Sequence, residues 1–429
     1  MKKKKRFAAV LTAVAALYVS GCGFGLKTES GRHSDPESSS EEKMVNTHIT
    51  YVEGNSERQT ETGLESATEN PAAVEIEIPD TAEYIVSFLS DEEREVFAQI
   101  YDGLSSFDES IEISPDVIHK DDVGDFIAML TYAVPYIDYI GQEYTICIDS
   151  SGYVASLEIT YNKSRKQSES ERAELDKRID EIVSQISPDW SDYEKVLYFH
   201  DEIALNCRYD DSADNPYSAY GCLVEGRAVC EGYSKAMQIL CTKAGVKCIP
   251  VAGKAYDSGE PQPHLWNKLM LDGEWSNFDV TWDDPVTDIG DNYVRYDYFG
   301  IADSECGSDH VADENKYFSY PEAFSASANY YKRNGLYADD SEPVWDIMSG
   351  SVERAMTDGS GIARLKCSDS EVYSAAVDEL FGGDSGGEIF TILRQCSEEV
   401  VGGWSSTSYS VIKNDELCTI TVILSSDQL

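Results

Sequence analysis

The stretch that decides the fold runs from Gly226 to Gly245 and reads GRAVCEGYSKAMQILCTKAG. Its apolar residues recur at spacings of three and four until the final glycine, which predicts a helix with one buried face. Cys230 lies in the first turn of this helix. Backbone N–H groups and the helix dipole favour a thiolate over a thiol at such a position. Cys230 is therefore a candidate nucleophile.

A β-hairpin is predicted farther along the chain. The alternating runs His264–Leu271 and Glu274–Thr281 flank Asp272-Gly273, a common two-residue hairpin turn. With Leu271 opposite Glu274, the expected pairs are Met270 with Trp275, Lys268 with Asn277, Trp266 with Asp279 and His264 with Thr281. This register makes His264 and Asp279 diagonal neighbours on one face, about 7 Å apart between Cα atoms. A hydrogen bond between the two side chains is expected.

Cys230, His264 and Asp279 together meet the requirements for a nucleophile, its general base and the group that orients the base. Each alone has a structural explanation, because a lone helical cysteine is more often a small core residue. The combination favours a catalytic triad. Of the other histidines, His200 falls on an apolar helix stripe and is expected to pack, and the sequence does not place His310 relative to the sulfur.

Three motifs carry a family resemblance: Val224–Tyr233, His264–Asn267 and Asp279–Pro285. The chain from about Ser191 to His310 resembles the bacterial transglutaminase-like superfamily. The resemblance implies an α+β, papain-like core in which a cysteine-bearing helix packs on an antiparallel sheet carrying the histidine and aspartate. It also implies that Cys230, His264 and Asp279 are nucleophile, base and partner. It leaves the substrate open, because the family includes cross-linkers, peptidases, amidases and inactive copies.

The N-terminus has the layout of a secretory signal. Basic residues 2–6 precede an apolar run from Phe7 to Val19 that is too short to span a membrane comfortably. The run ends in Val19-Ser20-Gly21-Cys22, which looks like a bacterial lipobox in which Cys22 becomes lipid-modified. An ordinary signal with an incidental cysteine is the alternative. We expect a cell-surface lipoprotein held by its lipid on the outward face of the bacterial cytoplasmic membrane.

Five segments are expected along the chain. They are a lipoprotein signal peptide (1–22), a disordered acidic tether rich in Ser, Glu and Thr (23–75), an N-terminal α+β accessory region (76–165), a transglutaminase-like catalytic domain (166–320) and a small C-terminal α/β accessory region (321–429). The tether holds too few large apolar residues to offset the entropy of ordering.

Local patterns add detail to the accessory regions. Capping boxes at Ser90/Glu93 and Ser191/Glu194 open two helices, and another helix is expected near Asp121–Ile140. A hairpin is expected from Tyr144–Asp149 and Tyr153–Tyr161. The C-terminal region is expected to contain a helix near Val372–Leu380 and strands at Glu388–Leu393 and Leu417–Leu424.

Composition limits the class of partner. With 79 acidic and 34 basic residues, the net charge of -45 argues against nucleic acid, whose phosphates would be repelled. The charge equally serves solubility without selecting a substrate. None of the eleven cysteines forms a C-x-x-C pair, so a zinc site is unsupported. No other metal and no cofactor is expected.

The expected function is thiol-dependent acyl transfer or hydrolysis at peptide or glutamine amides, with a slight preference for hydrolysis. Substrates would be proteins or peptides, with cell-wall peptides among the candidates. The backbone N–H of Cys230 would hold the oxyanion, and Tyr220 is a candidate for the second donor. The rival expectation is a non-catalytic binding protein that uses the same fold to hold cell-wall or protein ligands.

Overall fold

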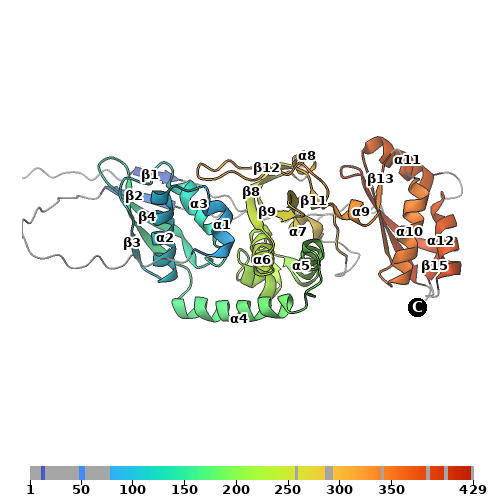
Figure 1. Cartoon of the computed structure of the whole chain (residues 1–429), viewed down its shortest axis with the longest axis horizontal. Coiled ribbons are helices and arrows are strands. Elements are labelled where there is room, and N and C mark those ends of the chain that lie inside the picture. Colours follow the sequence, from blue (N-terminus) through green and yellow to red (C-terminus); the bar gives the residue numbers. More distant parts are fainter. Residues whose placement is uncertain are drawn as a thin grey trace, which may run out of the picture. The chain divides into compact units, whose positions relative to one another are not determined.

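The computed structural model of the chain describes residues 11–14, 48–53, 78–256, 259–285, 293–339, 343–382, 387–400 and 404–426 (Figure 1). These residues divide into two compact units. The first holds the described residues up to Val294 together with Asp303–Phe324, and the second holds Arg295–Ala302 and those from Ser325 onward. Cys22 and most of the predicted signal and tether lie outside the described residues, although two short strands fall within those segments.

The N-terminal part of the first unit contains a five-stranded sheet with the strand order β1-β2-β4-β5-β3. Strands β2 and β4 are parallel, and the other neighbours are antiparallel. The strands are β1 (Leu11–Val14), β2 (His48–Glu53), β3 (Ser110–Glu112), β4 (Ile140–Ile148) and β5 (Val154–Tyr161). The helices are η1 (Asp80–Ala82), α1 (Glu83–Val86), α2 (Asp91–Ser105) and α3 (Val123–Ala133). The predicted hairpin of this region is confirmed as β4–β5.

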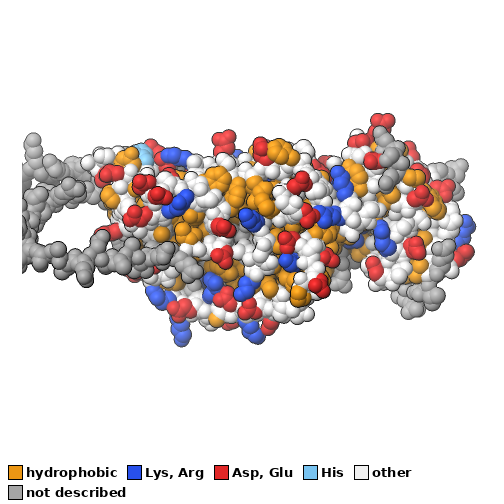
Figure 2. Space-filling model, in the orientation of Figure 1, with side chains coloured by type: hydrophobic (Ala, Val, Ile, Leu, Met, Phe, Trp, Pro, Cys, Tyr) orange, Lys and Arg blue, Asp and Glu red, His pale blue; other side chains and the backbone are white. Residues whose placement is uncertain are grey.

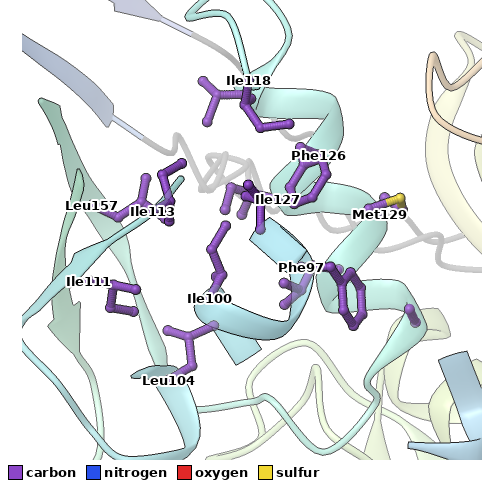
Figure 3. Close-up of a cluster of buried hydrophobic side chains, with 14 of the residues drawn as sticks. Phe97, Ile100, Leu104, Ile111, Ile113, Ile118, Phe126, Ile127, Met129 and Leu157 are labelled. Carbon is purple, nitrogen blue, oxygen red and sulfur yellow. The ribbon is translucent and has the colours of Figure 1, made fainter. Parts of the chain in front are cut away.

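One apolar cluster joins these helices to the sheet, as Figure 3 shows. Phe97 of α2, Phe126 of α3 and Leu157 of β5 have no exposed surface. Burying a side chain of this size contributes about 1.5–3 kcal/mol. The N-terminal region therefore has a core of its own.

Both predicted capping boxes are present. Glu93 N donates to Ser90 Oγ at 3.2 Å and Ser90 N donates to the Glu93 carboxylate at 2.8 Å, at the start of α2. Ser191 and Glu194 repeat the arrangement at the start of α5 (Asp192–Asn206). Each box satisfies backbone N–H groups that a helix start leaves without an intrahelical acceptor.

The central part of the first unit sets helices against an antiparallel sheet in which β10, β9, β8 and β12 lie side by side in that order. Helix α6 contacts β8, β9 and α5 (Figure 1). The helices are α4 (Arg165–Val183), α5, the π-helical turn η2 (Gly221–Glu225), α6 (Cys230–Lys243), α7 (Val280–Asp283) and α8 (Asp303–Cys306). The strands are β6 (Arg208–Tyr209), β7 (Arg227–Ala228), β8 (Cys248–Ala255), β9 (Gln262–Leu271), β10 (Glu274–Phe278) and β12 (His310–Ala312). The expected α+β class, with the cysteine helix packed on the histidine-bearing sheet, is confirmed.

Polar and aromatic contacts connect the N-terminal region to this central part within the first unit. Gln238 Nε2 of α6 donates to the carbonyl of Thr81 at 3.4 Å. Asn315 Nδ2 donates to the carbonyl of Asp125 at 3.2 Å, and Phe126 meets Tyr317 edge-on with ring centroids 4.9 Å apart. The contacts of Gln238 with Thr81 and of Phe126 with Tyr317 join buried residues of the two parts.

The second unit contains a four-stranded sheet with the order β13-β14-β16-β15. Helices α10, α11 and α12 bury their apolar faces with strands β14 and β16 in one core. The strands of this sheet are β13 (Tyr337–Ala338), β14 (Ile362–Cys367), β15 (Trp404–Asn414) and β16 (Thr419–Ser426), and the unit also contains the short strand β11 (Phe299–Ile301), which is not part of this sheet. Its helices are α9 (Tyr330–Arg333), α10 (Val344–Thr357), α11 (Ser370–Phe381) and α12 (Ile389–Glu399).

Two local predictions were wrong. The strand expected at Glu388–Leu393 is the beginning of α12, because Ile389, Ile392, Leu393 and Cys396 form one buried helical face. A short apolar run does not distinguish a strand from a buried helix. The helix expected near Asp121–Ile140 ends at Ala133, because Pro135 disfavours helical geometry in the residue before it, and Ile140 begins β4.

Three further features concern the surface charge, the buried thiols and the length of the helices. Acidic side chains are scattered over the face shown in Figure 2, and basic ones gather along its lower edge, where Figure 1 draws α4. The thiol of Cys222 hydrogen-bonds Cys207, and the thiol of Cys241 hydrogen-bonds Cys248. Burial raises the pKa of both Cys222 and Cys241. These thiols stay protonated. Among the described helices, none has the length and apolar character needed to cross a membrane.

Candidate active site

Cys230 is the first residue of α6, as the sequence predicts, and 2% of its surface is exposed. The preceding turn is fixed by a hydrogen bond from Val229 N to the carbonyl of Pro216 at 2.9 Å. Gly232 permits this packing, because a Cβ there would lie 2.9 Å from the carbonyl oxygens of both Pro216 and Ser218. The sulfur is thereby held at a helix N-terminus, where partial positive charge stabilises a thiolate.

Helix α6 is bonded to β9 close to the histidine. Ser234 Oγ donates to the carbonyl of Trp266 at 3.1 Å, and Asn267 Nδ2 donates to the carbonyl of Ser234 at 3.1 Å. All three residues are buried. These bonds fix the first turns of α6 against the middle of β9.

A second contact gives the direction of the helix. Farther along α6, the thiol of Cys241 hydrogen-bonds Cys248, which pairs with Leu269 across β8 and β9. Helix α6 and strand β9 therefore run the same way. Cys230 precedes Ser234 by one turn, about 6 Å, and His264 precedes Trp266 by two strand residues, about 6.6 Å. This geometry brings the start of α6 to the level of His264.

His264 and Asp279 form a direct hydrogen bond. His264 Nε2 lies 2.6 Å from Asp279 Oδ2, and both residues are buried. The bond fixes the imidazole with its Nδ1 available for proton exchange, and a carboxylate in this position stabilises the protonated ring. The sequence prediction that these two side chains meet is confirmed.

The predicted register holds only as far as Phe278. Leu271 pairs with Glu274, Met270 with Trp275 and Lys268 with Asn277, but β10 then ends. The pairings expected for Asp279 with Trp266 and for Thr281 with His264 were wrong. Asp279 is instead the N-cap of α7, where its Oδ1 accepts from Trp282 N at 3.2 Å. Aspartate is among the residues preferred at this position.

A second histidine shares the same carboxylate. His310 Nε2 lies 3.0 Å from Asp279 Oδ2, and His310 Nδ1 lies 2.6 Å from Asp309 Oδ1. His310 begins β12, which pairs with the far edge of β8. The sequence does not place His310, because no spacing in it indicates that so short a strand joins the sheet there.

The charges of Asp279 and His310 stabilise each other. Burial alone would raise the pKa of Asp279, but His264 and His310 outweigh it and hold the pKa well below its usual range. Burial alone would lower the pKa of His310, but its hydrogen bonds to Asp279 and Asp309 raise it to about 9. Asp279 is therefore ionised and His310 is protonated at neutral pH.

Two tryptophans surround the imidazoles. Trp266 stacks on His264 with centroids 6.2 Å apart, and Trp282 lies 5.7 Å from His264 and 4.4 Å from His310. Their rings exclude water from the charged group. Electrostatic interactions are stronger in such a low-dielectric setting.

His264, Asp279 and His310 also form the one group of potential metal ligands among the residues that the structure describes, with ligand atoms within 4.8 Å of one another. Their hydrogen bonds already use the facing atoms: Asp279 Oδ2 accepts from both imidazoles. A metal would have to replace both bonds. The donor set fits a hydrogen-bonded triad better than a metal centre.

His200 is the other buried histidine of this part. It was expected to pack on an apolar stripe, and it is fully buried. It also lies 3.1 Å from carboxylate oxygens of both Asp201 and Asp283. Burial would lower its pKa, but the two carboxylates raise the pKa to about 9. This ion pair joins α5 to α7.

Residues 180–280 match the family model described as the Transglutaminase-like superfamily. This segment is a transglutaminase-like domain. It contains Cys230, His264 and Asp279. Helix α6 and the sheet of β8, β9 and β10 thus belong to the fold that the sequence motifs predicted.

Two curated proteins are similar to part of this chain. The human and mouse proteins called kyphoscoliosis peptidase are each 27% identical over 124 residues, which cover 26% of this chain and 19% of the relative. The chain thus spans about a fifth of the length of these relatives. A solved structure described as a cysteine protease from Cytophaga hutchinsonii is 20% identical with a TM-score of 0.22 and covers 30% of this chain and 52% of its own. Another, described as a TGase, is 18% identical with a TM-score of 0.23 and covers 38% of this chain and 49% of its own.

A cavity of about 420 Å³ lies beside the first turn of α6. The central part contributes Gln167 at the start of α4, the loop of residues 214–218, Glu231 and Lys235, and the N-terminal region contributes residues of α3 and β4 and of the adjoining loops. Lys235 Nζ donates to Glu231 at 2.6 Å. Burial, with added charge from Glu231 and Cys230, raises the pKa of Tyr132 and Tyr217 in the lining. The lining includes Glu231, the residue that follows the candidate nucleophile, but not Cys230 itself.

Tyr220, the candidate for the second oxyanion donor, points elsewhere. Its hydroxyl donates to Glu174 of α4 at 3.1 Å. Burial and this carboxylate raise its pKa to about 12. The bond gives no support to a role in binding the oxyanion.

Proposed function

We propose that this chain is an enzyme that transfers or hydrolyses acyl groups at peptide or glutamine amides through Cys230, His264 and Asp279. The observation that carries the proposal is the buried hydrogen bond between Asp279 and His264 of β9, a strand that packs against the helix beginning at Cys230. The match of residues 180–280 to the transglutaminase-like family supports thiol chemistry.

In the proposed reaction, the Cys230 thiolate attacks the amide carbonyl and forms a C–S bond. The backbone N–H of Cys230 and a second donor hold the resulting oxyanion. The C–N bond then breaks as His264 passes its proton to the leaving amine, which leaves a thioester on Cys230. Water or a second amine attacks the thioester, His264 takes the proton of the attacking group, and the thiolate is released with an acid or a new amide.

We propose hydrolysis as the main outcome. The choice depends on which nucleophile reaches the thioester. Ammonia is released in either case, so the products distinguish the two: with a primary amine present, the glutamate peptide should still exceed the amine-bearing peptide. Amine incorporation that exceeds hydrolysis would overturn this assignment and identify a cross-linker.

The substrate would be a protein or peptide, bound in the cavity beside Cys230. The cavity is large enough for one or two side chains and has both apolar and hydrogen-bonding walls. This arrangement gives the N-terminal region a role, because its helix α3 forms one wall. Cell-wall peptides are candidate substrates for an exported enzyme.

We also propose that Cys22 carries a lipid that holds the enzyme on the outer face of the cytoplasmic membrane. The support is the sequence alone: a basic start, an apolar run and small residues before the cysteine. Labelled fatty acid should be incorporated into the native chain and into a Cys147→Ala control, but not into Cys22→Ala. Label that persists in Cys22→Ala would contradict the proposal.

The test of catalysis is covalent labelling by an acyl electrophile on the full chain. Native protein should be labelled and Cys230→Ala should not. Cys147→Ala is a suitable control, because this thiol on β4 is more exposed than Cys230. Labelling that survives in Cys230→Ala would refute the assignment.

The burial of Cys230 favours one rival function, a binding protein that holds ligands in the same cavity without chemistry. With 2% of the residue exposed, access to the sulfur requires local movement. If iodoacetamide fails to alkylate Cys230 at neutral pH while peptides still bind the chain, the rival is correct.

A further inference from the structure

Four buried or partly buried side chains form an alternating series of carboxylates and imidazoles. Asp309 Oδ1 lies 2.6 Å from His310 Nδ1, His310 Nε2 lies 3.0 Å from Asp279 Oδ2, and the same oxygen lies 2.6 Å from His264 Nε2. The proposed catalytic group uses only the last two members. The first two are unexplained by it.

We propose that His310 is a positioning residue whose positive charge partly neutralises Asp279 and thereby sets how tightly His264 holds its proton. The inference rests on the proposed function of Cys230 and His264, because it assigns a control on that pair. His310 does not touch the reacting atoms and acts only through Asp279.

The hydrogen bonds themselves require a protonated His310. A neutral imidazole has one N–H group and one nitrogen lone pair. Both ring nitrogens of His310 face carboxylate oxygens within 3.0 Å, and a lone pair aimed at either oxygen would be repelled. Two N–H donors satisfy both contacts. The pKa of about 9 agrees with this protonation state.

The fold holds His310 in this place by a close strand approach. Gly253 of β8 pairs with His264 on one side and with Ala312 of β12 on the other. A Cβ at Gly253 would lie 2.2 Å from the carbonyl oxygen of Val311, so only glycine lets β12 come this near. The His310 side chain has no exposed surface.

The groups that face His310 come from several elements. Asp309 precedes it in the chain, Asp279 lies at the start of α7 and His264 lies on β9. Trp266 and Trp282 pack on its ring, with centroids 5.0 Å and 4.4 Å away. The thiol of Cys306 lies within the field of Asp309 and Asp279, and burial raises its pKa, so it is neutral. Asp279 therefore lies between two imidazoles, and His310 is a second cation beside it when His264 is also protonated.

The effect on His264 follows from the charges. A protonated His310 balances part of the negative charge of Asp279, so Asp279 attracts the proton of His264 less strongly. Replacing His310 by glutamine keeps a donor but removes the cation. His264 then meets an unshared carboxylate and loses a like charge whose ring centroid is 5.3 Å away. We expect His264 to keep its proton to a pH about one unit higher.

The experiment follows imidazole titration by NMR in the full chain with labelled histidine. In native protein, both nitrogens of His310 should carry protons at pH 7, a reading that needs no variant. In His310→Gln, the pH at which His264 loses its proton should rise by about one unit. A neutral His310 in native protein, or an unchanged His264 in His310→Gln, would overturn the inference.

His200→Gln is the matched control. His200 is equally buried and also lies between two carboxylates, but its partners are Asp201 and Asp283 rather than Asp279. A purely structural role for His310 predicts that both variants change stability and neither changes the titration of His264. Iodoacetamide alkylation of Cys230 is measured in parallel. An unreactive Cys230 in native protein would refute the proposed function, while the NMR titration would still decide the role of His310.

Discussion

Asp279 binds His264 with one carboxylate oxygen and begins a helix with the other. Its Oδ2 lies 2.6 Å from His264 Nε2, and its Oδ1 accepts from Trp282 N at 3.2 Å. A single side chain thus orients the candidate base and caps α7. The two roles make different demands, because the cap needs only an oxygen acceptor, whereas the imidazole also responds to charge.

Asp279→Asn should separate these roles. Asparagine is as good an N-cap as aspartate, so the free energy of unfolding should fall by less than in Asp279→Ala, which also loses about 1 kcal/mol from the missing cap. Activity should drop by about 10²–10⁴-fold in both variants, because neither side chain stabilises a protonated His264. Urea unfolding and peptide turnover measure the two effects. Equal activity in Asp279→Asn and native protein would remove Asp279 from the mechanism.

The sequence predicted the hairpin and the meeting of His264 with Asp279, but for a partly wrong reason. Alternation and the Asp-Gly turn fix the ladder from Leu271 to Lys268. Nothing in the alternation indicates that the strand stops at Phe278 and that Asp279 becomes a cap. The side chains still meet, because a residue one step beyond a strand remains near the same partner.

The position of His310 could not be predicted from the sequence, for a reason other than an early strand end. Its position depends on a three-residue strand that joins the far edge of β8, a contact between segments distant in the chain. Strands so short carry too little periodicity to be recognised. Gly253 was the available signal, since a glycine inside a strand often marks a close backbone approach.

Gly253→Ala should therefore weaken the attachment of β12. The new Cβ would lie 2.2 Å from the carbonyl oxygen of Val311, which forces the strands apart and costs about 1–3 kcal/mol. Gly350→Ala is the control, because no atom lies within 4 Å of its Cβ position in α10, and alanine there should stabilise the helix by about 0.5–1 kcal/mol. Hydrogen exchange of β12 and unfolding curves provide the readouts. Native-like protection of β12 in Gly253→Ala would contradict the packing described.

Stability should fall as the pH rises from about 6.5 to 9. The pKa values of His200 and His310 are raised from an ordinary 6.5 to about 9 in the folded chain. A raised pKa means that the folded state binds the proton more tightly, so the stabilisation is complete below 6.5 and is lost as pH passes through 9. Each histidine contributes about 2–3 kcal/mol to this change.

Urea unfolding at pH 6, 7.5 and 9 measures that slope. His200→Gln should lower stability at pH 6 and reduce the pH dependence by roughly half, because one of the two buried imidazolium groups is gone. Stability that is flat or increases over this range would mean that the two histidines are neutral in the folded protein.

The cavity beside Cys230 leads to the last prediction. Thr131 of α3 lines it, and its hydroxyl donates to the carbonyl of Ala128 at 2.9 Å within the same helix. Thr131→Trp should fill much of the space with an indole while leaving Cys230, His264 and Asp279 in place. If peptides bind there, KM should rise at least about tenfold, which corresponds to the loss of roughly 1.4 kcal/mol of binding free energy.

Thr160→Trp is the control for this variant. It adds the same side chain at an exposed position on β5 and should leave KM unchanged. Neither substitution lies in α6 or in the turn that precedes Cys230, so alkylation of Cys230 by iodoacetamide should be equal in both variants. A native KM in Thr131→Trp would show that the substrate approaches Cys230 from another side and that the N-terminal region has no part in binding it.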